Sequence, residues 1–185
     1  GGNSSAKSEA VKSANIISSF PVSVDFESET DHSTTAGDIG FEFATTAWRN
    51  KSGDNGDWRA NSTSTPSPST GPSGASKFLY IEASSPNFPN KTFELWSPPF
   101  DLSALTYPVL TFQYHMYGTN MGALVIQVSA DHGDNWSSDL NFMASGAVNG
   151  DMGKEWRQGF IDLTAYKSST ALTIRFKGTT GSDYT

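Results

Sequence analysis

The sequence predicts an all-β protein, an antiparallel β-sandwich, and two observations indicate this fold. Of the 185 residues, 36% are hydrophobic and 17% are charged, so Ser, Thr, Asn and Gly make up much of the remainder. This composition suits short strands joined by polar loops better than helices, which favour Ala, Leu, Glu and Lys. The second observation is that apolar and polar residues alternate with period two in several segments.

The strands are expected from Phe20 onward, and residues 20–185 are predicted to form one domain. Residues 1–19 differ in composition and carry only a weak helical period, so they are interpreted as a linker, the tail of a preceding module or a cloning remnant, partly helical or disordered. The TNMG sequence at 119–122 predicts a hairpin between two strong strands. The expected strands lie at 22–27, 77–84, 108–118, 123–131, 156–164 and 171–179.

Two long polar connections interrupt this pattern. Residues 49–76 are rich in Gly, Pro, Ser and Asn and are expected to form one long loop. A second connection, residues 131–156, carries Trp136 and Trp156. Loops of this length in a compact domain are usually functional or mobile.

Composition excludes several classes of partner and site. The chain has no cysteine, so disulfides, thiolate zinc sites and cysteine nucleophiles are excluded. The net charge of -7 and the absence of a basic tract argue against nucleic acid. No apolar run approaches the roughly 20 residues that span a bilayer, so no membrane span is expected. An acidic surface rich in Ser, Thr and Asn is compatible with secretion.

Catalytic residues are not predicted. The chain contains neither a Gly-x-Ser-x-Gly elbow nor a His-Glu-x-x-His helix motif. The histidines at 32, 115 and 132 have no metal-ligand spacing. The sequence DHGDNW at 131–136 is similar to a calcium loop but lacks its repeated Asp pattern and its terminal Glu.

Several segments in fixed order resemble a MAM domain, the extracellular module named after meprins, a neuropilin antigen and a receptor tyrosine phosphatase. The resemblance covers roughly residues 20–185. It rests on DFE at 25–27, Trp48, DW at 57–58, TPSPSTGPSG at 65–74, FLYIEASSPNFPNKT at 78–92, SPPFDLS at 97–103, LTFQYHMYGTNMGALVIQVS at 110–129, and Trp156 with FIDLTAY and LTIRFKGTTGSDYT towards the end.

The resemblance implies a jelly roll related to the concanavalin-like lectin fold. It also implies a non-catalytic extracellular module of a multidomain protein, used for adhesion, protein association or substrate targeting. Pro99 stands where animal members usually have a cysteine, as in versions on secreted bacterial enzymes. The family normally continues after GSDYT with an acidic strand, and the lack of this strand would leave an unpaired sheet edge.

A metal site is predicted at the start of the domain. In a strand over 22–27, Asp25 and Glu27 share one face with their carboxylates about 6–7 Å apart, and hard cations take oxygen ligands. The resemblance implies a structural calcium or sodium ion there, and Asp57 is a further candidate ligand. Alternatively, these acids are solvated at a strand edge, or Glu27 only caps backbone N–H groups.

Ligand contacts are predicted on aromatic and amide side chains, because sugar-binding sandwiches combine exposed aromatic rings with hydrogen-bonding groups. In the 110–117 strand, Tyr114 and Met116 are expected to face the core, and the alternate residues face outward. Packing is the favoured interpretation for Trp48, Trp58 and Trp156, and an equal alternative to ligand contact for Trp96 and Trp136. The candidates for ligand contact are Trp58, Arg59, Trp96, Gln113, His115, Tyr117, Asn120 and Trp136.

The sequence thus leaves three hypotheses for function. The first is an extracellular adhesion or protein-association module, secreted or at the cell surface. The second is a carbohydrate-binding module that recognises a polysaccharide through exposed aromatic residues. An enzyme is the remote third.

Overall fold

The computed structural model of the protein describes residues 15–31, 37–38, 40, 42–61, 68, 70–142 and 147–183, and their regular structure is almost entirely β. Two 3-10 helices, η1 (Pro72–Gly74) and η2 (Thr164–Tyr166), accompany the strands. The strands are β1 (Arg49–Asn50), β2 (Trp58–Asn61), β3 (Phe78–Ile81), β4 (Thr92–Trp96), β5 (Val109–Tyr114), β6 (Ala123–Ser129), β7 (Ala147–Asn149), β8 (Arg157–Asp162) and β9 (Thr173–Thr179).

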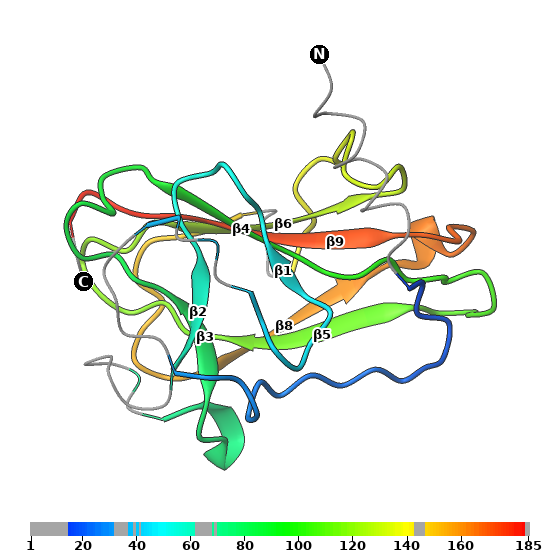
Figure 1. The fold of residues 1–185 in the computed structure, drawn as a ribbon, viewed down its shortest axis with the longest axis horizontal. Coiled ribbons are helices and arrows are strands. Elements are labelled where there is room, and N and C mark those ends of the chain that lie inside the picture. Colours follow the sequence, from blue (N-terminus) through cyan, green and yellow to red (C-terminus); the bar gives the residue numbers. More distant parts are fainter. Residues whose placement is uncertain are drawn as a thin grey trace.

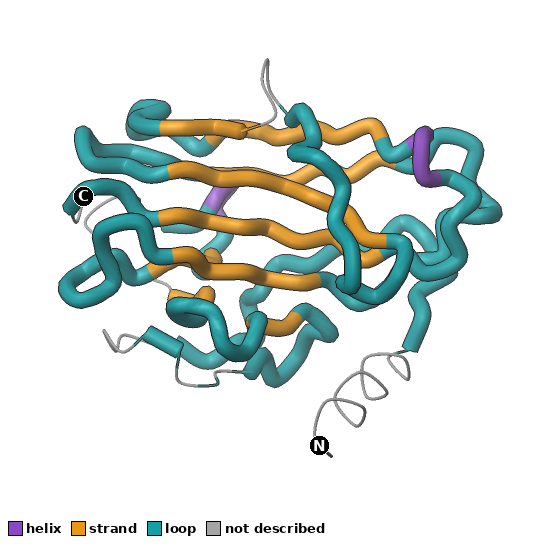
Figure 2. Tube along the Cα trace, turned by 90° about the horizontal axis from the view of Figure 1, so that it is seen from above, coloured by secondary structure: helices purple, strands orange, loops and turns teal. Residues whose placement is uncertain are grey.

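The strands form two packed layers, as the sequence predicts for a β-sandwich. One layer is a five-stranded antiparallel sheet with the order β1-β4-β9-β6-β7, and its strands lie side by side in Figure 2. The other layer contains the β5–β8 ribbon, drawn below the first layer in Figure 1. A third pair, β2–β3, lies near one end of the sandwich.

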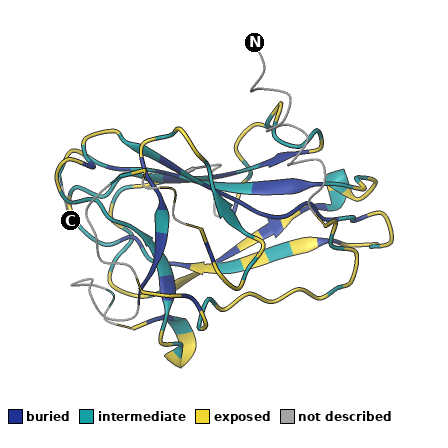
Figure 3. Cartoon of the chain, viewed as in Figure 1, coloured by how far each residue is buried: buried dark blue, intermediate teal, exposed yellow. Residues whose placement is uncertain are grey.

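The core lies between the layers and follows the period of two. Ile126 and Ile174 enter it from the five-stranded sheet, and Ile161 enters it from β8. Tyr114 and Met116 face it with exposed fractions of 4% and 6%, which confirms the orientation predicted for this strand. Each fully buried side chain of this kind stabilises the fold by roughly 1.5–3 kcal/mol relative to an exposed one. Figure 3 shows buried segments in strands of both layers.

The hairpin predicted around TNMG is wrong. β5 pairs with β8, whereas β6 pairs with β9 and β7, so residues 115–122 carry the chain from one layer to the other. Alternation within each strand specifies which face is buried but does not specify the partner strand. Both strands therefore keep their predicted inward faces although they lie in different sheets.

The strand predicted over 22–27 is also absent. Phe26 has a left-handed φ of 60°, and a turn follows it over residues 27–28. The Asp25 side chain accepts a hydrogen bond from the backbone N–H of Glu27 at 3.1 Å, a local bond that competes with strand pairing. Asp25 and Glu27 therefore do not share one face of a strand.

The segment expected as one long loop, 49–76, contains β1, β2 and η1. Its two strands are short and polar, so they do not show the apolar alternation that marks the longer strands. Before the domain, Ile17 already pairs with Phe100 in a parallel bridge. Residues 1–19, for which a partly helical or disordered linker was predicted, lie mostly outside the described residues.

None of the helical segments among the described residues has the length and hydrophobicity that crossing a bilayer requires.

Candidate functional site

The outer face of the β5–β8 ribbon has an open apolar end. Tyr107, Val109 and Phe160 are 80%, 51% and 53% exposed, although each is large and hydrophobic. The register places Phe160 opposite Thr111 and Val109 opposite Asp162, so Val109 and Phe160 are diagonal neighbours on one face. Sequence reasoning missed this site, although the period that places Tyr114 inward also places Val109 outward.

The other end of this face holds three predicted ligand residues together. His115 lies 5.5 Å from the ring of Trp156 and 6.4 Å from the ring of Tyr117. The Lys154 ammonium lies 5.3 Å from the centre of the Tyr117 ring. Gln113 donates a hydrogen bond to the Ser73 hydroxyl at 3.3 Å, so a loop partly covers this end.

His115 contributes to this cluster as a hydrogen-bond donor. Its Nε2 lies 2.9 Å from the Lys154 carbonyl oxygen, which can only accept, so Nε2 carries the proton. Burial lowers the pKa of His115, although the Lys154 carbonyl, Glu155 and Asp151 act in the opposite direction. The imidazole is thereby held by the segment that precedes Trp156. Residue 32, the first histidine, lies outside the described residues.

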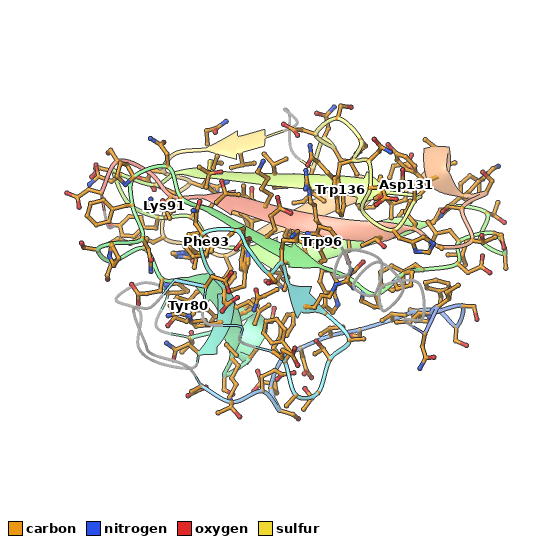
Figure 4. All side chains as sticks on the ribbon, turned by 45° about the horizontal axis from the view of Figure 1, so that its top comes forward. Tyr80, Lys91, Phe93, Trp96, Asp131 and Trp136 are labelled. Carbon is orange, nitrogen blue, oxygen red and sulfur yellow. The ribbon has the colours of Figure 1, made fainter. Side chains whose placement is uncertain are left out.

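Trp96 and Trp136 are brought together on the outer face of the five-stranded sheet, as Figure 4 shows. Their ring centres are 4.9 Å apart in an edge-to-face arrangement. Trp96 is only 8% exposed, because Gly133 lies over its ring: a Cβ at Gly133 would come within 2.5 Å of it. The exposed platform expected of Trp96 is therefore wrong, and this ring is part of a covered cluster.

Cations complete the packing of these two rings. The Arg175 guanidinium lies 4.2 Å from the centre of the Trp136 ring, and the Arg49 guanidinium lies 5.2 Å from that of Trp96. Arg175 also forms a 3.1 Å ion pair with Glu94, which accepts a hydrogen bond from the Trp96 indole at 2.9 Å. Because the Arg175 and Glu94 side chains are largely buried, this arrangement stabilises the sheet, and Arg175 occupies one face of the Trp136 ring.

The loop that resembles a calcium loop uses its carboxylate for its own backbone. Asp131 accepts hydrogen bonds from the Ser129 hydroxyl at 2.6 Å and from the Asn135 backbone and side-chain amides at 2.9 and 2.7 Å. The Ser129 hydroxyl and the Asn135 amides lower the pKa of Asp131 to about 2. His132 and Gly133 complete the turn with positive φ angles of 64° and 96°. The spacing Ser-x-Asp-x-Gly-x-Asn indicates a self-contained turn.

The three predicted metal ligands do not gather. Both oxygens of Glu27 are engaged: the carboxylate accepts the N–H groups of Ser76 at 2.8 Å and Lys77 at 3.0 Å, and the Ser76 hydroxyl. The Ser76 hydroxyl is the main cause of the lowered pKa of Glu27. Asp25 is exposed, whereas Asp57 is buried. Across the described part of the chain, no three Asp, Glu or His side chains form a group suited to a metal ion.

In this arrangement Asp25, Glu27 and Asp57 do not form a cation site by themselves. Glu27 instead caps backbone N–H groups, which was the sequence-based alternative to metal binding. The calcium or sodium ion that the resemblance implies stays a prediction.

A buried neighbour, Glu29, was missed by sequence reasoning. It is 1% exposed, and its carboxylate accepts the N–H groups of Ala44, Thr45 and Thr46 at 2.8, 2.9 and 3.1 Å, and the Thr45 hydroxyl. Burial alone would raise the pKa of Glu29, but these hydrogen bonds lower it overall. The 44–46 loop therefore encloses the Glu29 carboxylate of the N-terminal segment. No local sequence pattern indicates this contact.

Two further ligand candidates belong to the interior. Trp58 donates its indole N–H to the Phe93 carbonyl at 3.1 Å and packs against the core. Arg59 is fully buried and donates to the Gly37 carbonyl at 3.1 Å, while its Nε and Nη1 atoms have no hydrogen-bond partner among the described residues. Arg59 is therefore inaccessible to a ligand in this conformation, and Trp58, which is partly buried, acts as the packing anchor that was its alternative. Asn120 lies elsewhere, where it accepts a hydrogen bond from the Ser182 hydroxyl at 3.2 Å.

The raised pKa of Asp54 leads us to expect an unusual pH dependence of stability. Burial raises its pKa from the ordinary 3.8 to about 6, with smaller contributions from the Glu94 and Asp38 charges, although the N–H groups of Glu94 and Gly56 oppose the shift. The folded state therefore binds a proton that the unfolded state has lost between these two values. We expect the Asp54 contribution to stability to be present near pH 4 and to be lost as the pH rises through about 6.

The measurement is urea unfolding of the wild type and of Asp54→Asn from pH 4 to 7. The difference in unfolding free energy between the two should shift against the wild type as the pH rises. Asp101→Asn is the control, because the Ser103 hydroxyl and N–H lower the pKa of Asp101 below the ordinary 3.8, so the difference between this variant and the wild type should stay nearly constant from pH 4 to 7. An Asp54→Asn difference that stays constant over this range would contradict the prediction.

Comparison with known proteins identifies the family. The family model described as "MAM domain, meprin/A5/mu" matches residues 39–185. MAM domain-containing glycosylphosphatidylinositol anchor protein 1 is 34% identical to this chain over 141 residues in Rattus norvegicus and in Mus musculus, and 28% identical in Gallus gallus. The match covers 71% of this chain but only 14% of each relative's length.

Among solved structures, the K1 cleaved adhesin domain of Lys-gingipain from Porphyromonas gingivalis W83 is similar at a TM-score of 0.47 and 15% identity, covering 75% of this chain and 92% of that chain. The match of the family model extends over most of the two layers and includes every strand described above. The chain belongs to the MAM domain family.

Proposed function

We propose that this domain is a non-catalytic association module of a secreted or cell-surface protein and that it binds a protein partner through the outer face of the β5–β8 ribbon. The observation that carries the proposal is the exposure of Val109 and Phe160, diagonal neighbours on that face, with the exposed Tyr107 two residues before Val109. Apolar residues that lie together on a surface mark interaction sites more often than scattered ones do.

The composition of the face supports a protein partner. Besides its apolar residues, the paired strands present Thr111, Gln113 and Gln158 outward, and Asp162 is the one charged outward residue of the register. The centres of protein interfaces are depleted in charge and enriched in aromatic residues. Membership of the MAM family and the names of the anchor proteins that share it support an extracellular setting.

The test is a pair of matched double variants screened against an array of purified extracellular proteins. Val109→Ser with Phe160→Ser removes the two diagonal neighbours, and Val22→Ser with Val24→Ser removes two exposed valines of the N-terminal segment. We expect a partner bound by the wild type and the second variant to be bound at least about tenfold more weakly by the first, since apolar anchors at an interface dominate affinity. Equal binding by both variants would overturn the proposed face.

A further inference from the structure

A shallow cavity of about 330 Å³, widely open to solvent, lies at one end of the five-stranded sheet, away from the β5–β8 face. Its floor is a cross-strand row in which Thr179 of β9 lies opposite Ala123 of β6, and Ala123 lies opposite Asn149 of β7. The walls come from the turn at 89–90 and from residues 180–182. The cavity therefore combines segments that are distant in sequence.

The walls of this cavity are backbone held in place by close contacts. A Cβ on Gly122 would lie 1.8 Å from the Thr179 carbonyl oxygen, and one on Gly181 would lie 1.6 Å from the Asn120 carbonyl oxygen. Gly150 donates its N–H to the Gly122 carbonyl at 2.8 Å, and Asn90 donates to the Thr180 carbonyl at 3.1 Å. Because backbone contacts fix its shape, the cavity exists before any ligand arrives.

The side chains that line the cavity are polar but uncharged. Asn90 and Asn149 carry amides, each of which can both donate and accept, and Thr179 and Ser182 carry hydroxyls with the same ability. Met121 adds a small apolar surface. None of the described residues that line the cavity is charged, so neither a phosphate or carboxylate nor a metal ion would find a counter-charge among them.

We propose that this cavity binds one neutral saccharide unit. A sugar ring presents hydroxyl groups that need donors and acceptors together and a C–H surface that needs a small apolar contact. The volume falls at the lower end of the range for small-molecule sites, which suits a single ring. Asn120 is a positioning residue, because its side-chain oxygen accepts the Ser182 hydroxyl and orients it at the rim.

This site is independent of the proposed protein-binding face. It also differs from the aromatic platform expected from the sequence, because Trp96 lies under Gly133 and is only 8% exposed. A saccharide at this end of the sandwich would leave Val109 and Phe160 free for a protein partner.

The test is saturation-transfer NMR followed by calorimetric titration with defined probes. The neutral probes are the methyl glycosides of glucose, galactose, mannose and N-acetylglucosamine, and the charged probes are glucuronic acid and glucose 6-phosphate. Asn149→Ala removes an amide from the floor, and Ala123→Leu fills the floor. The control is the double variant Val109→Ser with Phe160→Ser, which changes only the ribbon face.

We expect at least one neutral probe to bind, and the charged probes not to bind. Asn149→Ala should weaken that binding by about tenfold, the loss of one or two hydrogen bonds. Ala123→Leu should abolish it, and the ribbon variant should leave it unchanged. The proposal is overturned if no neutral probe binds, if only charged probes bind, or if binding survives Ala123→Leu and disappears in the ribbon variant. None of these outcomes bears on the protein-binding test, which uses a different probe and a different face.

Discussion

Replacing Glu29 with alanine is expected to lower the free energy of unfolding by about 2–4 kcal/mol. The variant removes the acceptor of three backbone N–H groups, those of Ala44, Thr45 and Thr46, and of the Thr45 hydroxyl. Glu29 is 1% exposed, so its removal also leaves a buried space behind. Urea unfolding monitored by tryptophan fluorescence measures the loss.

Glu27→Ala is the matched control for this variant. Glu27 lies two residues away and also accepts two backbone N–H groups and one hydroxyl, those of Ser76 and Lys77. It is solvent-accessible, so water can replace the carboxylate when it is removed, and a much smaller loss is expected. Equal losses in the two variants would show that burial of Glu29 is not the cause.

The part of the Glu29 contribution that depends on the ionised carboxylate should be lost in acid. Its pKa is lowered below the ordinary value of 4.5, so the stabilisation is complete above that value and is lost as the pH falls through the folded-state pKa. Wild type and Glu29→Ala should therefore approach each other in stability at low pH.

Replacing Gly122 with alanine is expected to cost about 2–4 kcal/mol, because the new methyl group meets backbone on two sides. Its Cβ would lie 1.8 Å from the Thr179 carbonyl oxygen and 2.7 Å from the Gly181 nitrogen. Neither neighbour is a flexible side chain, so the crossing connection at 115–122 must separate from the end of β9. Equilibrium unfolding measures the cost, and amide hydrogen exchange at the end of β9 reports the local separation.

Gly40→Ala is the control for Gly122→Ala, because it distinguishes the cost of steric crowding from the cost of backbone strain. Gly40 has a left-handed φ of 69°, and no atom of the described residues lies within 4 Å of a Cβ placed on it, so alanine there meets strain without a collision. Its expected cost is about 1 kcal/mol. A Gly122 variant no less stable than the Gly40 variant would contradict the close approach.

The period of two predicted much of the fold. It indicated β3, β5, β6, β8 and β9, and it placed Tyr114 and Met116 in the core. It could not indicate which strands pair, because the same inward face satisfies either neighbour. The strand expected at 22–27 failed because the Asp25 side chain bonds to the backbone N–H of Glu27 and Phe26 takes a left-handed φ, local choices that compete with alternation.

The candidate site could be predicted only in part, because the exposure and the neighbours of a side chain depend on residues that are distant in sequence. Gln113, His115 and Tyr117 face outward as their positions require, and the structure adds Trp156 beside them. Trp96 lies on the outer face as well, but a glycine 37 positions later covers it, and no local pattern contains that information. The exposure of Phe160 was not predicted, because phenylalanine is usually buried and its residue type therefore favours a place in the core.

The crossing between layers has a kinetic consequence. Every long strand pairs with a partner that is remote along the chain. β4 and β6 both pair with β9, and β5 pairs with β8. Chains dominated by such non-local pairs have high contact order and fold in milliseconds to seconds rather than microseconds. During synthesis the central position of the larger sheet stays vacant until β9 has emerged from the ribosome. The edges of β4 and β6 are then open to mispairing, so a chaperone that covers them during synthesis should raise the yield of native domain.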